Sequence, residues 1–138
     1  MAFGFNEDKT KATVITSDEY AQLCKVQFKS VASEGAVQIE NNVVETVQLF
    51  NLPGNGTYII SARLLFSGRA GGQRRIFLTT NESASTWQNQ CDGTGNDYLS
   101  TSIIVKVTSA TTIFIRALQN SGQTCNVTPS DIAYVRLY

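Results

Sequence analysis

The residues best suited to bind a ligand lie in the polar segment 81–97, which carries the only tryptophan of the chain, Trp87. Gln88, Asp92 and Asn96 follow it. An aromatic face packs against the C–H face of a sugar ring, and amides and carboxylates hydrogen-bond to its hydroxyls. The segment therefore predicts a carbohydrate-binding site formed by these four residues. The alternative is that Trp87 fills one end of the fold or a subunit boundary, since large aromatic side chains are mostly buried.

The composition argues against catalysis. The 138-residue chain has no histidine, which removes the commonest general base and every Ser-His or Cys-His nucleophile pair. Enzymes built on paired carboxylates stay open, but the acidic residues have no spacing that makes them converge. Three arginines, Arg69, Arg74 and Arg75, are expected to serve solubility more than anion recognition. We therefore expect a protein that is not an enzyme and needs no cofactor.

One short segment offers oxygen ligands for a metal ion. Asp92, Thr94 and Asn96 alternate along Asp92-Gly-Thr-Gly-Asn-Asp97, and calcium takes oxygen ligands of this kind. Glycine, asparagine and aspartate are also the residues that turns require. The second explanation is favoured, so the segment predicts a turn-forming loop and no metal site.

The three cysteines are Cys24, Cys91 and Cys125, and an odd number leaves at least one thiol unpaired within the chain. Cys91 and Cys125 lie nearly symmetrically about a predicted chain reversal at Ser109-Ala110, which would bring both to the same end of the fold. They are the candidate disulfide. In a reducing host both would stay free thiols. Cys24 is expected to be a small buried apolar residue.

Alternating apolar and polar residues predict most of the chain to be strands. The clearest runs are Tyr98 to Thr108, Thr111 to Leu118 and Asp131 to Tyr138. Upstream runs cover Cys24 to Ala32, Ala36 to Glu40, Val43 to Phe50, Thr57 to Ser67 and Arg74 to Thr80. The last two flank Gly68 to Gly72, which predicts a hairpin with a glycine-rich turn. Together the runs predict an all-β jelly-roll sandwich of about eight to ten antiparallel strands.

Length and charge limit the organisation and the partners. A chain of 138 residues fits one domain. We assign 24–138 to the jelly roll and 1–23 to an N-terminal arm, in which Thr16 and Glu19 form a capping box that predicts a short helix. The 11 basic and 11 acidic residues give zero formal charge, which disfavours nucleic acid as a partner. No apolar run reaches the ~20 residues that span a membrane, and the N-terminus lacks the layout of a secretory signal.

Two features carry a resemblance to a known family. Gly56-Thr57-Tyr58 opens a long predicted strand, and Tyr134 and Tyr138 lie in the last one. In this strand order, the chain from about Lys25 to the end resembles the globular heads of the complement and tumour necrosis factor jelly-roll superfamily. The usual Gly-Asp turn of that family is replaced here by Ser109-Ala110, which favours the phage or bacterial branch, such as tail fibre or baseplate receptor-binding heads.

The resemblance implies an assembly and a location. Heads of this family are homotrimers that bury an aromatic and aliphatic face of one sheet around a three-fold axis. The interface candidates are Tyr58, Phe114, Tyr134 and Tyr138; the alternative is that they belong to the core of the sandwich. The expected location is a virion or another extracellular surface, with the N-terminal arm joining the head to a larger assembly and no insertion into a membrane.

The expected function is a non-catalytic trimeric binding head, most plausibly a phage tail or baseplate receptor-binding or adhesion protein that recognises a cell-surface glycan. Two alternatives come from other classes. One is a secreted ligand of the complement or tumour necrosis factor type, or a structural protein. The other is a carbohydrate-active enzyme on a sandwich fold, which would require converging carboxylates in a cleft.

Overall fold

The computed structural model describes residues 16–17, 28–83 and 86–138. Within these ranges the chain forms seven strands. The strands are β1 (Lys29–Val31), β2 (Val37–Ile39), β3 (Glu45–Leu52), β4 (Gly56–Thr79), β5 (Asn89–Val107), β6 (Thr111–Gln119) and β7 (Cys125–Arg136). The predicted N-terminal arm with its helix lies almost wholly outside the described residues, and so does Cys24. No helix in the described ranges is long and apolar enough to cross a membrane.

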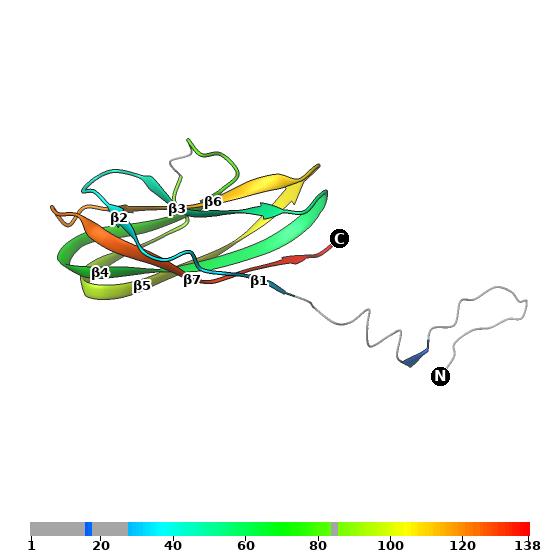
Figure 1. Ribbon diagram of the computed structural model, residues 1–138, viewed down its shortest axis with the longest axis horizontal. Helices are drawn as coiled ribbons and strands as arrows, with labels where there is room; N and C mark the ends of the chain where they lie inside the picture. Colours follow the sequence, from blue (N-terminus) through cyan, green and yellow to red (C-terminus); the bar gives the residue numbers. More distant parts are fainter. Residues whose placement is uncertain (1–15, 18–27, 84–85) are drawn as a thin grey trace, which may run out of the picture.

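The long strands β4 and β5 form one curled hairpin that takes part in both layers of a sandwich (Figure 1). The first half of β4 pairs with β7, and its second half pairs with β6. β1 and β2 both pair with β7, whereas β3 pairs with β6. All these pairings are antiparallel, and the hydrogen-bonded order β1-β7-β4-β6-β3 folds back on itself into two layers. The predicted all-β jelly roll is therefore confirmed.

The predicted hairpin around Gly68 to Gly72 is wrong, because β4 runs through this segment without reversing. Gly71 and Gly72 have φ values of 77° and 85°, which glycine adopts without strain. The register with β5 shifts between Phe66 and Arg69 and again between Ala70 and Gln73. Such bulges bend a strand. The glycines thus carry β4 around the corner from one layer to the other.

The C-terminal strands agree with the sequence prediction in position but differ in connection. β5 ends at Val107 and β6 begins at Thr111, as expected. The two strands do not form a hairpin across Ser109-Ala110, because β5 pairs with β4 and β6 pairs with β3 and β4. At Ser109-Ala110 the chain instead passes from β5, in the layer that contains β7, to β6, in the layer that contains β3. Past β7, pairing continues through the Leu137 N–H, which donates to the Thr57 carbonyl at 2.7 Å.

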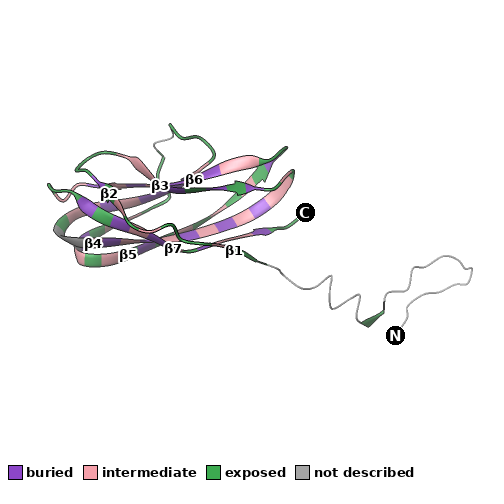
Figure 2. Ribbon diagram, viewed as in Figure 1, coloured by how far each residue is buried: buried purple, intermediate pink, exposed green. Residues whose placement is uncertain are grey.

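The core lies between the two layers and is made by every second residue of the long strands (Figure 2). Tyr58 is 0% exposed. Its ring meets that of Tyr134 edge-on at 5.9 Å, and Tyr134 stacks on Phe50 at 5.8 Å. Tyr58 therefore lies within the core and presents no surface for a three-fold interface. Of the other interface candidates, Tyr134 is half-buried against the core, Phe114 is half-buried, and Tyr138 is 82% exposed.

Candidate functional site

Gln88 fixes the position of the loop that carries Trp87. Its backbone N–H donates to the Ile76 carbonyl at 3.0 Å. Its side-chain Oε1 accepts from the Leu78 N–H at 2.6 Å, and its Nε2 donates to the Leu78 carbonyl at 3.1 Å. The Gln88 side-chain amide thus bonds to both backbone groups of Leu78 in β4, at a point that precedes the first residue of β5. Gln88 was predicted to contact a ligand, but its side chain holds the loop against the sheet.

We predict that Gln88→Ala destabilises the protein. Leu78 is buried, so both of its backbone groups would lose their partner, which costs about 1–3 kcal/mol per group. Urea unfolding followed by circular dichroism measures the loss. Gln38→Ala, which shortens an exposed glutamine of β2, is the matched control. An unfolding midpoint equal to that of this control would contradict the role of Gln88.

Trp87 lies beside a planar cation. The Cζ atom of Arg75 is 5.0 Å from the centroid of the Trp87 ring. The guanidinium is held by two neutral amides: its Nε donates to Gln90 Oε1 at 2.7 Å, and its Nη2 donates to Gln73 Oε1 at 3.1 Å. Gln90 lies directly opposite Arg75 in the β4–β5 register. The two hydrogen bonds to Gln90 and Gln73 thus fix the orientation of the Arg75 guanidinium over the Trp87 ring.

Asp92 completes this surface. It is exposed and lies directly opposite Gln73, on the same outer face of the hairpin as Gln90. We call the five residues Gln73, Arg75, Trp87, Gln90 and Asp92 the Trp87 patch. Trp87 is 42% exposed, so part of its ring is open to solvent. The patch combines an aromatic face, a fixed donor, amides and a carboxylate, which is the chemistry that sugar recognition requires.

The structure brings only some of the four predicted site residues together, and the ligand-binding role stays a prediction. Trp87 and Asp92 lie in the patch. Asn96 lies in the corner between the layers, at the register shift where Gly95 pairs with Arg69 and Asp97 with Phe66. The sequence prediction assigned Arg75 to solubility and did not single out Gln73 or Gln90. The strand alternation on either side of Arg74 was the signal that could have placed Arg75 on the outer face.

Arg74, the neighbour of Arg75, is a structural residue. Only 1% of it is exposed, and its Nη1 donates to Asp97 Oδ2 at 2.9 Å while its Nη2 donates to the Gly95 carbonyl at 3.2 Å. The guanidinium passes directly over Gly93, where a Cβ would lie 0.9 Å from Nη1. We call this arrangement of Arg74, Asp97, Gly93 and Gly95 the Arg74 latch. It fixes the corner at which β5 passes between the layers, so the expectation that Arg74 serves solubility is wrong.

The segment predicted to be a turn-forming loop, Asp92 to Asp97, is part of β5. Its register with β4 shifts twice along this segment, each time with the extra residue in β4. The segment continues as a strand and does not reverse the chain, which corrects the loop prediction. Among the described side chains there is no group of three histidine, cysteine, aspartate or glutamate residues placed to hold a metal ion.

The predicted disulfide is not formed, because Cys91 and Cys125 are both free thiols in the structure. Cys91 belongs to β5 and lies opposite Arg74. Cys125 begins β7, opposite Ile39, and its Sγ donates to the Ser67 carbonyl at 3.4 Å. The symmetric placement about Ser109-Ala110 failed as an argument because β5 and β6 are not paired with each other.

We predict that Cys91 reacts slowly with alkylating reagents at neutral pH. Burial raises the pKa of the Cys91 thiol, and the carboxylate of Asp97 raises it further, against the opposing effect of Arg74. Only the thiolate is nucleophilic. Alkylation of Cys91 by iodoacetamide should therefore need a higher pH in the folded protein than in urea. Peptide mass mapping over a pH series measures this, and equal midpoints in both states would contradict it.

Comparisons with known proteins concern the fold alone. No protein-family model matches the sequence, and no curated protein matches it. A solved structure of infectious bursal disease virus, Gx strain, is similar with 15% identity and a TM-score of 0.49, over 98% of this chain and 37% of that chain. The VP2 subviral particle of infectious bursal disease virus is similar with 11% identity and a TM-score of 0.49, over 81% and 32%. This chain thus spans only about a third of their length. The complement and tumour necrosis factor resemblance stays a prediction.

Proposed function

We propose that this protein is a non-catalytic binding head of a virion or another extracellular surface assembly, and that it recognises a cell-surface glycan through the Trp87 patch. The observation that carries the proposal is the stacked pair of Trp87 and Arg75, held by Gln73 and Gln90. Side chains fixed in this way before the ligand arrives lose less conformational entropy on binding. A glycan would stack on the exposed part of the indole and hydrogen-bond to the polar side chains around it.

The patch suits this role better than a purely structural one. An aromatic side chain that serves packing alone is normally buried, whereas Trp87 keeps 42% of its surface exposed. Arg75 is held by neutral amides, so its positive charge is available to a hydroxyl or carboxylate of a sugar. The exposed carboxylate of Asp92 adds an acceptor for sugar hydroxyls on the same face.

A homotrimer is part of the proposal. Three exposed apolar residues, Phe28, Leu137 and Tyr138, support it. Leu137 and Tyr138 follow β7, and Phe28 immediately precedes β1, whose first residue lies opposite Tyr134 near the end of β7. Exposed apolar side chains that gather at one end of a sheet are typical of subunit contacts. Light scattering on the full chain should give the mass of a trimer, and a monomer would contradict this part.

Glycan-array binding by the purified full chain tests the function. We expect binding to one class of glycan, and we expect Trp87→Ala to reduce it up to about ten-fold, because an aromatic stacking contact contributes about 0.5–1.5 kcal/mol. Leu49→Ala is the matched control, because it removes an exposed apolar side chain from β3. The proposal fails if the unmodified protein binds no glycan, or if Trp87→Ala binds as Leu49→Ala does.

A further inference from the structure

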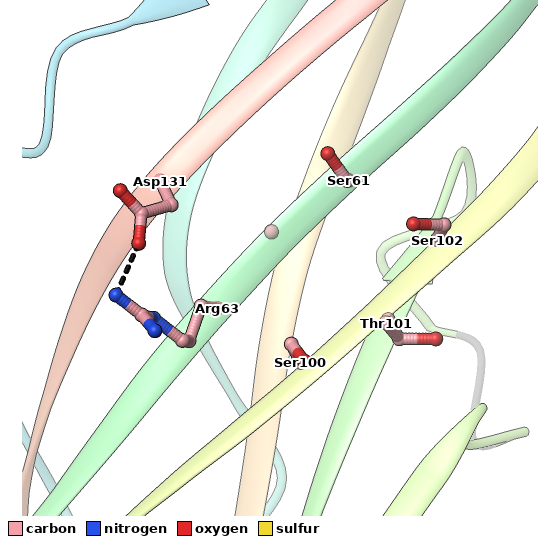
Figure 3. Close-up of a pocket in the computed structure, with 7 residues that line it drawn as sticks. Ser61, Arg63, Ser100, Thr101, Ser102 and Asp131 are labelled. Atoms are coloured by element: carbon pink, nitrogen blue, oxygen red, sulfur yellow. Dashed lines mark ion pairs between the residues drawn. The ribbon is translucent and has the colours of Figure 1, made fainter.

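A hollow whose lining residues do not belong to the Trp87 patch lies where β5, β4 and β7 run side by side. It measures about 340 Å³ and is lined chiefly by Ser61, Arg63, Ser100, Thr101, Ser102 and Asp131 (Figure 3). These residues come from the first half of β4, the second half of β5, and β7, which are hydrogen-bonded neighbours. The volume falls at the small end of the range for ligand pockets, about 300–1,000 Å³. We call this hollow the Arg63 pocket.

A bulge in β7 places a carboxylate over this pocket. Ser130 lies opposite Arg63 and Ala133 opposite Ser61, so β7 carries an extra residue at this point. Asp131 has a φ of 49°, in the left-handed region that residues other than glycine seldom adopt. Bulges of this kind re-aim side chains and are common beside binding and active sites. Here the bulge turns Asp131 outward, while its neighbour Ile132 is buried.

Arg63 forms the adjacent wall of the pocket. Its guanidinium makes an ion pair with Asp131 (Figure 3). Its Cζ lies 4.6 Å from the centroid of the Tyr98 ring, and its Nε donates to Ser130 Oγ at 3.5 Å. Both members of the ion pair remain partly exposed, so each can still hydrogen-bond to a ligand. A cation and an anion thus lie side by side at a pocket lined by serine and threonine hydroxyls, and Tyr98 supports the cation from outside the pocket.

We propose that the Arg63 pocket is a separate binding site for a single neutral sugar residue. Neighbouring hydroxyls of a sugar ring would donate to Asp131 and accept from Arg63, and the hydroxyls of Ser61, Ser100 and Ser102 can bond to the remaining sugar hydroxyls. The ligand is neutral because Asp131 already balances the charge of Arg63 and repels an acidic sugar. An exposed ion pair adds little to stability. This site stands whether or not the Trp87 patch binds a glycan.

Nuclear magnetic resonance of the full chain tests the proposal. The isotope-labelled protein is titrated with methyl α-mannoside, methyl β-galactoside and, as the acidic comparison, N-acetylneuraminic acid. We expect at least one neutral glycoside to give saturable amide shifts centred on Ser61, Arg63 and Ser102. Asp131→Asn should weaken that binding at least about ten-fold, as expected for loss of a charged hydrogen-bond acceptor. The fluorescence of Trp87 should change little during the titration, because Trp87 is not among the residues that line the pocket.

Two further variants separate the pocket from the patch and from misfolding. Asp92→Asn removes an exposed carboxylate of the Trp87 patch and should leave the pocket titration unchanged. Asp131→Gly accommodates the left-handed backbone but lacks the carboxylate, so it should keep the wild-type spectrum elsewhere and lose binding. The proposal is overturned if neither neutral glycoside gives saturable shifts, if Asp131→Asn and Asp131→Gly both bind as the wild type does, or if the acidic sugar binds more tightly than both neutral ones.

Discussion

Replacing Gly93 with alanine should lower the free energy of unfolding by about 3–5 kcal/mol, the cost of breaking a buried ion pair. The added Cβ would lie 0.9 Å from Arg74 Nη1 and 2.0 Å from its Cζ. Arg74 must therefore move, although only 1% of it is exposed. Any such movement breaks its contacts with Asp97 and the Gly95 carbonyl and leaves a buried charge without compensation. Urea unfolding monitored by circular dichroism measures the loss.

The control for this effect is Gly54→Ala, since a Cβ at Gly54 would meet nothing within 4 Å. A double-mutant cycle identifies the cause. In an Arg74→Ala background the clash with the guanidinium is gone, and the remaining close approach is to Asp97 Oδ2 at 2.5 Å, on a side chain that is 30% exposed and has room to shift. Gly93→Ala should therefore cost less there than in the native protein. If Gly93→Ala unfolds at the same urea concentration as Gly54→Ala, the Arg74 latch does not stabilise the corner of β5.

Tyr58→Ala should lower the free energy of unfolding by a similar amount, about 3–5 kcal/mol, because it leaves a large cavity in the core. The side chain is fully buried, meets Tyr134 edge-on and donates from its hydroxyl to the Gly54 carbonyl at 2.8 Å. Tyr58→Phe keeps the ring and loses only that hydrogen bond, so it should cost about 1 kcal/mol. Thermal or urea unfolding of the two variants separates the packing and hydrogen-bond contributions.

This pair of variants also separates core from interface among the predicted trimer contacts. Tyr138→Ala removes a ring that is 82% exposed, and we expect it to change the stability of the subunit by no more than about 0.5 kcal/mol. If Tyr58→Ala proved as mild as Tyr138→Ala, the position of Tyr58 between the two layers would be wrong.

Strands with strict alternation could be predicted from the sequence, whereas the path of the longest strand could not. In β6, Ile113, Ile115 and Ala117 all face the core, as a period of two residues requires. β4 was divided at Gly68 to Gly72 because a tight reversal and a bulged bend both use glycine with positive φ. Whether the reversal or the bend forms depends on the pairing of β4 with β6 and with the first half of β5. The local sequence around the glycines carries no information about that pairing.

The same reason explains how far the site could be predicted. Trp87 and Asp92 stand out by residue type, and both lie in the patch. Gln88 also stood out, but its amide bonds to the backbone of Leu78 in the neighbouring strand. The Arg63 pocket drew no prediction, because its side chains come from three strands and the projection of Asp131 depends on a bulge in β7.

The most direct test of the central claim is a fluorescence titration of the full chain with the glycan that binds best on the array. Trp87 is the only tryptophan, so the tryptophan emission reports on the Trp87 patch alone. We predict a saturable change in emission with the same midpoint as the heat of binding measured by calorimetry. A calorimetric binding curve with no accompanying change in Trp87 emission would contradict the claim that this patch is the glycan-binding site.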